Sequence, residues 1–283
     1  MQPVSDDVLN MSLSFVSVGA SSSSGIGDVP LSAAPRALPR NRPMILLLRR
    51  QLESLGAQAP MASGVVPLAT PVPCDMGPDG TTGSETTDSQ PTMTTVTFMN
   101  CFSGGETING QLSLTNIMSP AAGEFTGHVT HNLTFVQVGL PTFVSSGNFD
   151  IDHKTAGTVI TDTLTGGPLN LSIGSDNAAI SAFTIISSFD SSSSDETDSV
   201  AGTIATTAIG GSVTVTTPTA FTTVATSTFP STGQFLIKGA SNSAVRFTVL
   251  GDETLPGNQV TLEVDPEGDG TFQAPVGMTW ASL

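Results

Sequence analysis

Residues 127–138 read GHVTHNLTFVQV, in which Val129, Leu133 and Phe135 are separated by even numbers of positions. Residues an even number apart on a β-strand point to the same face of the sheet. The stretch therefore predicts a strand that buries one face and leaves the polar residues of the other face in solvent.

Short runs of this kind recur from about residue 92 onward, divided by glycine, proline and asparagine. Strands at this spacing, with no helical stretch between them, are typical of antiparallel meanders and sandwiches. We therefore predict a mostly-β protein, with residues 191–198 (SSSSDETD) as a solvated loop. The predicted strands are 94–99, 111–117, 127–138, 143–151, 157–164, 169–173, 179–188, 199–208, 211–217, 221–228, 233–238, 244–250, 258–264 and 271–273.

Residues 1–70 differ in character from residues 71–283, so we predict an N-terminal arm followed by one β-rich domain. Within the arm, residues 19–43 contain four prolines and a serine run, which indicates an extended linker. A short helix is expected at 43–55, with Pro43 in its first turn and Gly56 as its stop. Residues 8–18 fit either a strand or one helical face, and the pattern leaves the choice open.

The charge is unevenly distributed. The first fifty residues hold five arginines and three of the 24 acidic residues, whereas the rest of the chain is strongly acidic; the formal net charge is −16. Such a balance argues against nucleic-acid binding and against general attraction to anionic lipid. The arginines either face solvent or dock on the acidic body, of the same chain or of a neighbour. They are Arg36, Arg40, Arg42, Arg49 and Arg50.

No run approaches the roughly 20 apolar residues of a transmembrane helix, so no transmembrane segment is expected. Little lysine with much threonine, serine and glycine indicates an exported bacterial surface protein. In such a protein Cys74 and Cys101, 27 residues apart at the ends of a Gly/Asp/Thr-rich loop, most simply form one disulfide. Two buried thiols are the alternative.

Several fragments resemble a loose group of uncharacterised exported bacterial β-rich proteins, which include lipoprotein-like and surface proteins. The resemblance implies an extracellular or envelope location and the Cys74–Cys101 pair, and it implies no activity. A lipid-attachment cysteine is absent. The fragments are VTFMNC (96–101), INGQLSL (108–114), GQFLIKGA (233–240), VRFTV (245–249), VDPEGDGTF (264–272) and Trp280.

Two groups of residues invite a metal hypothesis. His128 and His131 lie three apart, so a strand would point them to opposite faces, where cross-strand polar contacts are expected instead. Asp265, Glu267 and Asp269 open like a calcium loop. The twelfth position of that loop is Val276, which has no carboxylate, and a hairpin turn explains the same residues. We therefore expect no bound metal or other cofactor.

No nucleophile elbow or phosphate-binding loop is present, so an enzyme is not expected. We expect an extracellular or cell-surface structural protein that self-associates through its arm, as a filament or sheath subunit. The partner would be another copy of the chain. The alternative is a periplasmic or surface binding module for an apolar ligand. The residues expected to mediate self-association are the five arginines together with Leu9, Met11, Leu13 and Phe15.

Overall fold

The computed structural model describes residues 71–280. It leaves out 78–79, 91–92, 104–105, 119–120, 122, 138, 140–141, 174–175, 207–210 and 228. The predictions made for residues 1–70 all lie outside the described residues. These include the helix at 43–55, the undecided segment 8–18 and every residue expected to mediate self-association.

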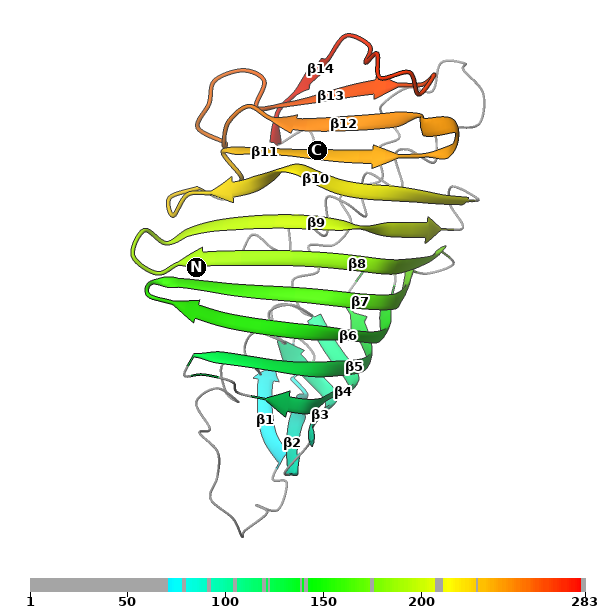
Figure 1. Ribbon diagram of the computed structural model, residues 1–283. Coiled ribbons are helices and arrows are strands. Elements are labelled where there is room, and N and C mark those ends of the chain that lie inside the picture. The colour runs from blue at the N-terminus through cyan, green and yellow to red at the C-terminus, as the bar shows by residue number, and fades with distance from the viewer. Residues whose placement is uncertain are drawn as a thin grey trace. The chain divides into compact units, whose positions relative to one another are not determined.

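The described residues form antiparallel strands whose order in the sheet is their order in the chain (Figure 1). This confirms the prediction of a mostly-β protein with a meander topology. A 3₁₀ turn, η2 (Ala240–Asn242), lies between β11 and β12. The strands are β1 (Pro71–Met76), β2 (Thr82–Gln90), β3 (Met93–Ser103), β4 (Glu106–Met118), β5 (Glu124–Val136), β6 (Phe143–Ala156), β7 (Val159–Ile173), β8 (Asp176–Asp190), β9 (Asp195–Thr206), β10 (Gly211–Thr223), β11 (Thr232–Lys238), β12 (Ala244–Val249), β13 (Val260–Asp265) and β14 (Val276–Met278).

Backbone contacts divide the chain into two compact units. The described residues of the amino-terminal unit are 71–154 and 164–180, and those of the carboxy-terminal unit are 155–163 and 181–280, apart from the gaps given above.

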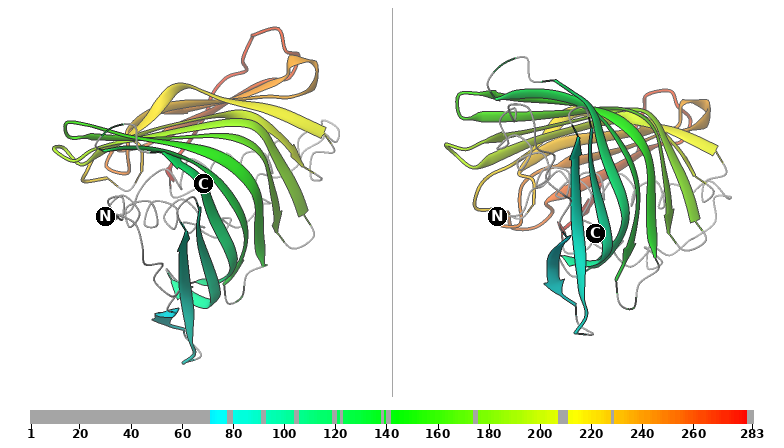
Figure 2. Two further views of the ribbon diagram at one scale, coloured as in Figure 1. Left: turned by 60° about the horizontal axis from the view of Figure 1, so that its bottom comes forward. Right: turned by 90° about the horizontal axis from the view of Figure 1, so that it is seen from below.

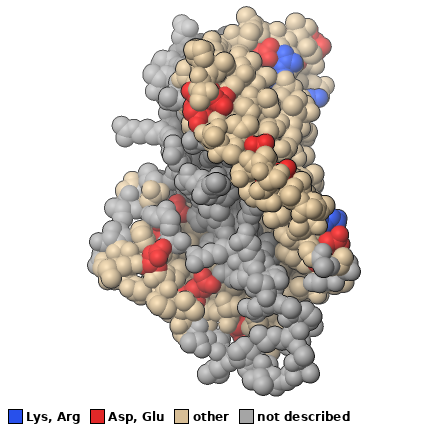
Figure 3. Space-filling model, turned by 90° about the vertical axis from the view of Figure 1, so that its left-hand side faces the viewer, with Lys and Arg blue, Asp and Glu red and all other residues tan. Residues whose placement is uncertain are grey.

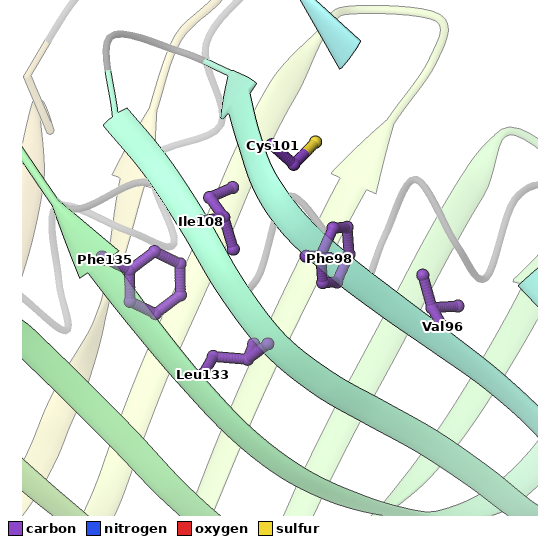
Figure 4. Close-up of a cluster of buried hydrophobic side chains, with 6 residues drawn as sticks. All are labelled: Val96, Phe98, Cys101, Ile108, Leu133 and Phe135. Carbon is purple, nitrogen blue, oxygen red and sulfur yellow. The ribbon is translucent and has the colours of Figure 1, made fainter. Parts of the chain in front are cut away.

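The core of the amino-terminal unit follows the alternation that the sequence predicts. On β5, Val129, Leu133 and Phe135 are buried, while their polar neighbours point the other way. Strands β4, β5 and β6 bend along their length (Figure 2), and the apolar cluster lies across β3, β4 and β5 (Figure 4). Fully burying an apolar side chain of this size stabilises a fold by about 1.5–3 kcal/mol. The cluster comprises Val96, Phe98, Cys101, Ile108, Leu133 and Phe135, with Cys74 and Phe143 packed against it.

Strands β1 and β2 replace the loop that we expected between the cysteines. The nine residues of β2, TGSETTDSQ, contain no apolar side chain, so hydrophobic periodicity could not reveal the strand. Its pairing with β3, from Ser84 opposite Met99 to Gln90 opposite Met93, determines its position. Cys74 and Cys101 form a disulfide, as expected.

A bulge in β3 brings Cys101 onto the buried face. The register with β4 shifts between Phe98 and Cys101, and Asn100 adopts a positive φ of 49°. The side chain of Asn109 accepts a hydrogen bond from the Asn100 amide at 2.8 Å. The extra residue of the bulge compensates for the odd spacing between Phe98 and Cys101, so both side chains point into the core.

In the carboxy-terminal unit, aromatic rings form the centre of the core. Phe221 lies 6.5 Å from Phe235 and 6.4 Å from Phe247, between ring centroids. Trp280 packs on Phe247 at 5.9 Å and stacks on Phe229 at 5.0 Å. The indole nitrogen of Trp280 donates to the carbonyl of Gly251 at 3.0 Å, which satisfies the polar end of a buried ring.

We predicted two separate strands, 211–217 and 221–228. The structure instead has one strand, β10, which continues across Pro218. The register between β10 and β9 shifts between Val215 and Phe221. There the hydroxyl of Thr217 accepts from the amide of Val200 and donates to its carbonyl, each at 2.8 Å. One side chain thus supplies the hydrogen bonds that the backbone next to Pro218 does not.

Three further predictions were wrong in their boundaries. Segments 157–164 and 169–173 are parts of one strand, β7, because Gly166 and Gly167 adopt positive φ and let the strand continue. Residues 271–273 are not a strand, and β14 begins at Val276. Only residues 191–194 of the predicted solvated loop form a turn, and β9 starts at Asp195.

We predict that Gly83→Ala destabilises the protein by about 1–3 kcal/mol, as overpacking does. A Cβ atom at Gly83 would overlap the backbone carbonyl of Asn100 in the β3 bulge. Urea unfolding followed by circular dichroism measures the change. The matched control is Gly157→Asn. Gly157 has a φ of 63° and open space around a Cβ, and asparagine tolerates that conformation, so its effect should stay within about 0.5 kcal/mol. Equal effects of the two substitutions would contradict this account of the bulge.

Candidate functional site

The two histidines of β5 point to opposite faces, as strand geometry predicts. His128 lies on the outer face, and its Nδ1 is 2.7 Å from the Oδ1 of Asp150 on β6. His153, also on β6, stacks on Phe125 with ring centroids 4.8 Å apart. The outer face of these strands therefore carries a cross-strand polar pair, whereas Phe125 and His153 pair on the face that also carries the buried Val129 and Phe149.

His131 lies on the buried face, next to a serine. Its Nε2 is 2.8 Å from the hydroxyl oxygen of Ser145, and its ring meets Phe149 edge-on at 5.9 Å. A serine bonded to a histidine is the minimal pair of nucleophile and base, but His131 is 3% exposed and Ser145 0%. A substrate could not reach the hydroxyl, so the pair acts in packing.

Burial shifts the pKa values of two groups in the amino-terminal unit in opposite directions. Desolvation lowers the pKa of His131 from 6.5 to about 4. Desolvation also raises the pKa of Glu106, which is buried on β4, from 4.5 to about 7. Both shifts favour the uncharged form in the folded protein.

The calcium-loop candidate forms a turn that uses its first carboxylate internally. Asp265 is buried, and its two oxygens accept the amides of Gly268 at 2.8 Å and Gly270 at 2.9 Å. Asp269 accepts the amide of Thr271 at 2.7 Å, while Glu267 is exposed. Within the described part of the chain, no three His, Cys, Asp or Glu residues are grouped to hold a metal.

Two carboxylates that sequence reasoning placed in solvent lie inside the carboxy-terminal unit. Glu196 is 5% exposed and Asp198 is 1% exposed, both on β9. Glu196 accepts a hydrogen bond from Ser187 at 3.2 Å. The signal was present in the alternation of DETDSV, where Glu196, Asp198 and Val200 occupy every second position. The alternation was not interpreted as a strand because the segment is rich in serine and acidic residues, which is typical of solvated loops.

The described basic residues are engaged with acids or exposed on the surface. Arg246 makes two hydrogen bonds of 2.8 Å to Glu263, and its guanidinium lies 4.0 Å from the ring centroid of Phe272. Lys154 bonds to Asp152 at 2.6 Å. Lys238 is exposed.

Three apolar residues of β1 and β3 lie on one face of the sheet, close in sequence to the end of the arm. Pro73 pairs with Ser84 and Ser84 pairs with Met99, so Pro73 and Met99 share a face. Met76 pairs with Thr82, two positions from Ser84, and joins that face. Met76 is 69% exposed and Met99 is 63% exposed. We call Pro73, Met76 and Met99 the β1 patch.

Charged side chains are sparse on one described face of the molecule. On the face seen in Figure 3, most described atoms belong to neither acidic nor basic side chains. In the described ranges, no helix has the length and hydropathy needed to cross a membrane.

We predict that the two buried titrating groups affect stability in opposite directions as pH changes. Below pH 6.5 the unfolded chain protonates His131 and the folded chain does not. His131 therefore makes the free energy of unfolding rise with pH between 4 and 6.5. Above pH 4.5 the unfolded chain ionises Glu106 while the folded chain keeps its proton. Glu106 therefore makes the same free energy fall with pH between 4.5 and 7.

Urea unfolding of Glu106→Gln, His131→Gln and the unsubstituted protein across pH 4–7.5 tests this. The free energy of unfolding of Glu106→Gln, minus that of the unsubstituted protein, should rise by about 3 kcal/mol from pH 4.5 to 7. The same difference for His131→Gln should fall by about 3 kcal/mol from pH 4 to 6.5. Three parallel curves would show that neither shift exists.

Comparison of the chain with protein-family models, curated proteins and solved structures gives no match.

Proposed function

We propose that this protein is an extracellular or cell-surface structural protein whose copies associate through the N-terminal arm, residues 1–70. Association of each copy with the next would build a filament or sheath. The observation that carries the proposal is the β1 patch, which lies on β1, the strand that begins immediately after the arm, and on β3.

The exposure of the β1 patch favours a contact surface. Exposed apolar residues are common singly, but grouped ones mark sites of interaction. Methionine suits such a surface, because its flexible thioether adapts to the shape of a partner. The disulfide between Cys74 and Cys101 holds β1 beside β3. It therefore limits the movement of Met76 and Met99 relative to each other.

The disulfide also supports an extracellular location. Disulfides form and persist in oxidising compartments and are rare in the cytosol. The pair closes a 27-residue separation, for which the chain-entropy estimate is a stabilisation of about 3 kcal/mol. This stabilisation would be lost in a reducing compartment.

The arm supplies complementary apolar residues in the proposed assembly. Leu9, Met11, Leu13 and Phe15 form a short apolar segment, and 25 residues of extended linker follow it at 19–43. Extended chain spans about 3 Å per residue, so the linker alone reaches roughly 75 Å. A segment on such a tether can reach the β1 patch of a neighbouring copy.

We predict that Met76→Gln with Met99→Gln lowers the mass of the assembled full-length protein, and that Leu9→Asn with Leu13→Asn does the same. Both pairs remove apolar area from the proposed contact, and Met76 and Met99 are exposed. Sedimentation velocity at neutral pH measures the mass. Met118→Gln is the matched control, since Met118 is 64% exposed on β4 and lies outside the patch; it should assemble normally.

Assembly that is unchanged in both double variants would refute the proposed contact. A monomer that carries co-purified lipid in native mass spectrometry would favour the other function, a binding module for an apolar ligand.

A further inference from the structure

A methionine and a histidine flank Thr115 on one face of the sheet in the amino-terminal unit. Met93 on β3 and His128 on β5 both pair with Thr115 on β4, from opposite sides. Residues paired across antiparallel strands have their side chains on the same face. That face is the outer one, because Val129, which follows His128 and points the other way, is buried in the core.

A bulge near the end of β4 brings a second methionine to this outer face. The register between β4 and β5 shifts between Thr115 and Met118, and Asn116 adopts a positive φ of 53°. Met118 pairs with Thr126, which is two positions from His128 and so shares its face. The extra residue of the bulge therefore compensates for the odd spacing along β4.

The side chains of Met93, Met118 and His128 lie within reach of one another above Thr115. Met93 and His128 are two strands apart, which separates their Cα atoms by roughly 10 Å. Met118 lies diagonally across one ladder from His128, at roughly 7–8 Å. Met93 is 39% exposed and Met118 is 64% exposed. Their unbranched side chains have three rotatable bonds, so both sulfur atoms can turn toward the imidazole.

A carboxylate on β6 orients the imidazole as a metal ligand. The Nδ1 atom of His128 is 2.7 Å from the Oδ1 atom of Asp150. An ionised carboxylate accepts hydrogen bonds and donates none, so Nδ1 carries the proton. In the neutral ring, Nε2 then presents its lone pair. Metal-binding histidines commonly donate their other ring nitrogen to a carboxylate in this way.

These donors select a soft cation. Thioether sulfur binds Cu(I), whereas magnesium and calcium prefer oxygen ligands. Thiolates would also bind Cu(I), but the two cysteines of this chain, Cys74 and Cys101, are joined in the disulfide. Two thioethers with one imidazole therefore favour Cu(I), and Ag(I) is its analogue without redox chemistry.

We infer that Met93, Met118 and His128 bind one Cu(I) ion through two sulfur atoms and Nε2, while Asp150 positions the histidine. The expectation of no bound metal considered residues that are close together in the sequence. Met93 and Met118 are 25 residues apart, and Met118 and His128 are 10 residues apart. Pairing of β3, β4 and β5 brings them to one place. The site does not depend on self-association or on the arm.

Anaerobic titration of the full-length protein with Cu(I), in competition with a chromophoric Cu(I) chelator, tests the site. The unsubstituted protein should withdraw one Cu(I) ion from the chelator. Met93→Leu, Met118→Leu and His128→Gln should each weaken the affinity about tenfold or more, because each removes a ligand. All three side chains are at least partly exposed, so the substitutions should leave the fold intact.

Met99→Leu is the matched control. Met99 is 63% exposed and lies on the same strand as Met93. It is six positions away, which corresponds to roughly 20 Å along the strand, so its substitution should leave the Cu(I) affinity unchanged.

Methionine methyl signals in nuclear magnetic resonance spectra identify the sulfur ligands directly. Silver nitrate is added in a chloride-free buffer, and the nine methionines of the chain are followed together. The signals of Met93 and Met118 should shift, whereas that of Met99 should not. Asp150→Asn should lower the affinity about 10–100-fold. At saturating silver it should still show both methyl shifts, because Asp150 positions the histidine and is not itself a ligand.

Three results would overturn the inference. One is an absence of Cu(I) binding by the unsubstituted protein. Another is an equal affinity in the Met93→Leu, Met118→Leu and Met99→Leu variants, which would place the ion elsewhere or on the imidazole alone. The third is displacement of Cu(I) by an equimolar amount of zinc, because zinc prefers nitrogen, oxygen and thiolate ligands to thioethers.

Discussion

The structure depends on strict alternation of side chains along long antiparallel strands. Charged residues are scarce, so the difference between the two faces comes mainly from apolar side chains against threonine, serine and asparagine. On β4 the even-numbered residues Ile108, Leu112 and Leu114 are buried, and the ladder with β5 keeps Val129 and Leu133 on the same side. A slip of one residue would turn every one of these side chains to solvent.

Where the chain departs from this alternation, specific residues restore it. The bulge at Asn100 returns Cys101 to the buried face, and Gly83 leaves room for it. At Pro218 the hydroxyl of Thr217 takes over both hydrogen bonds to Val200. These devices keep the register across positions where a regular ladder would end.

The same alternation explains what could be predicted from the sequence. Strands with apolar residues at every second position, such as β5 and β12, were found near their true bounds. The strand β2 was missed because it has no apolar residue, and its position comes from pairing with β3. The glycines inside β7 and Pro218 inside β10 were interpreted as the ends of strands. Local sequence signals do not reveal that pairing with a neighbouring strand continues past such residues.

Some of the candidate sites could likewise be predicted from the sequence, and others could not. The Cys74–Cys101 disulfide was predictable from composition and count. The burial of Glu196 and Asp198 was not, because a serine-rich acidic segment is normally solvated and only the pairing of β9 with β10 places it inside. The arm residues lie outside the described part of the chain, so their roles come from sequence and charge alone.

The two buried titratable groups of the amino-terminal unit follow one electrostatic rule. Desolvation favours their uncharged forms, which Glu106 keeps below about pH 7 and His131 keeps above about pH 4. The β1 patch, by contrast, is exposed in the described part of a single copy.

Light scattering of the full-length protein across a range of concentrations at neutral pH tests the central claim of self-association most directly. The account predicts a mass well above the 28.8 kDa of one chain, increasing with concentration. A mass of one chain at every concentration would contradict it.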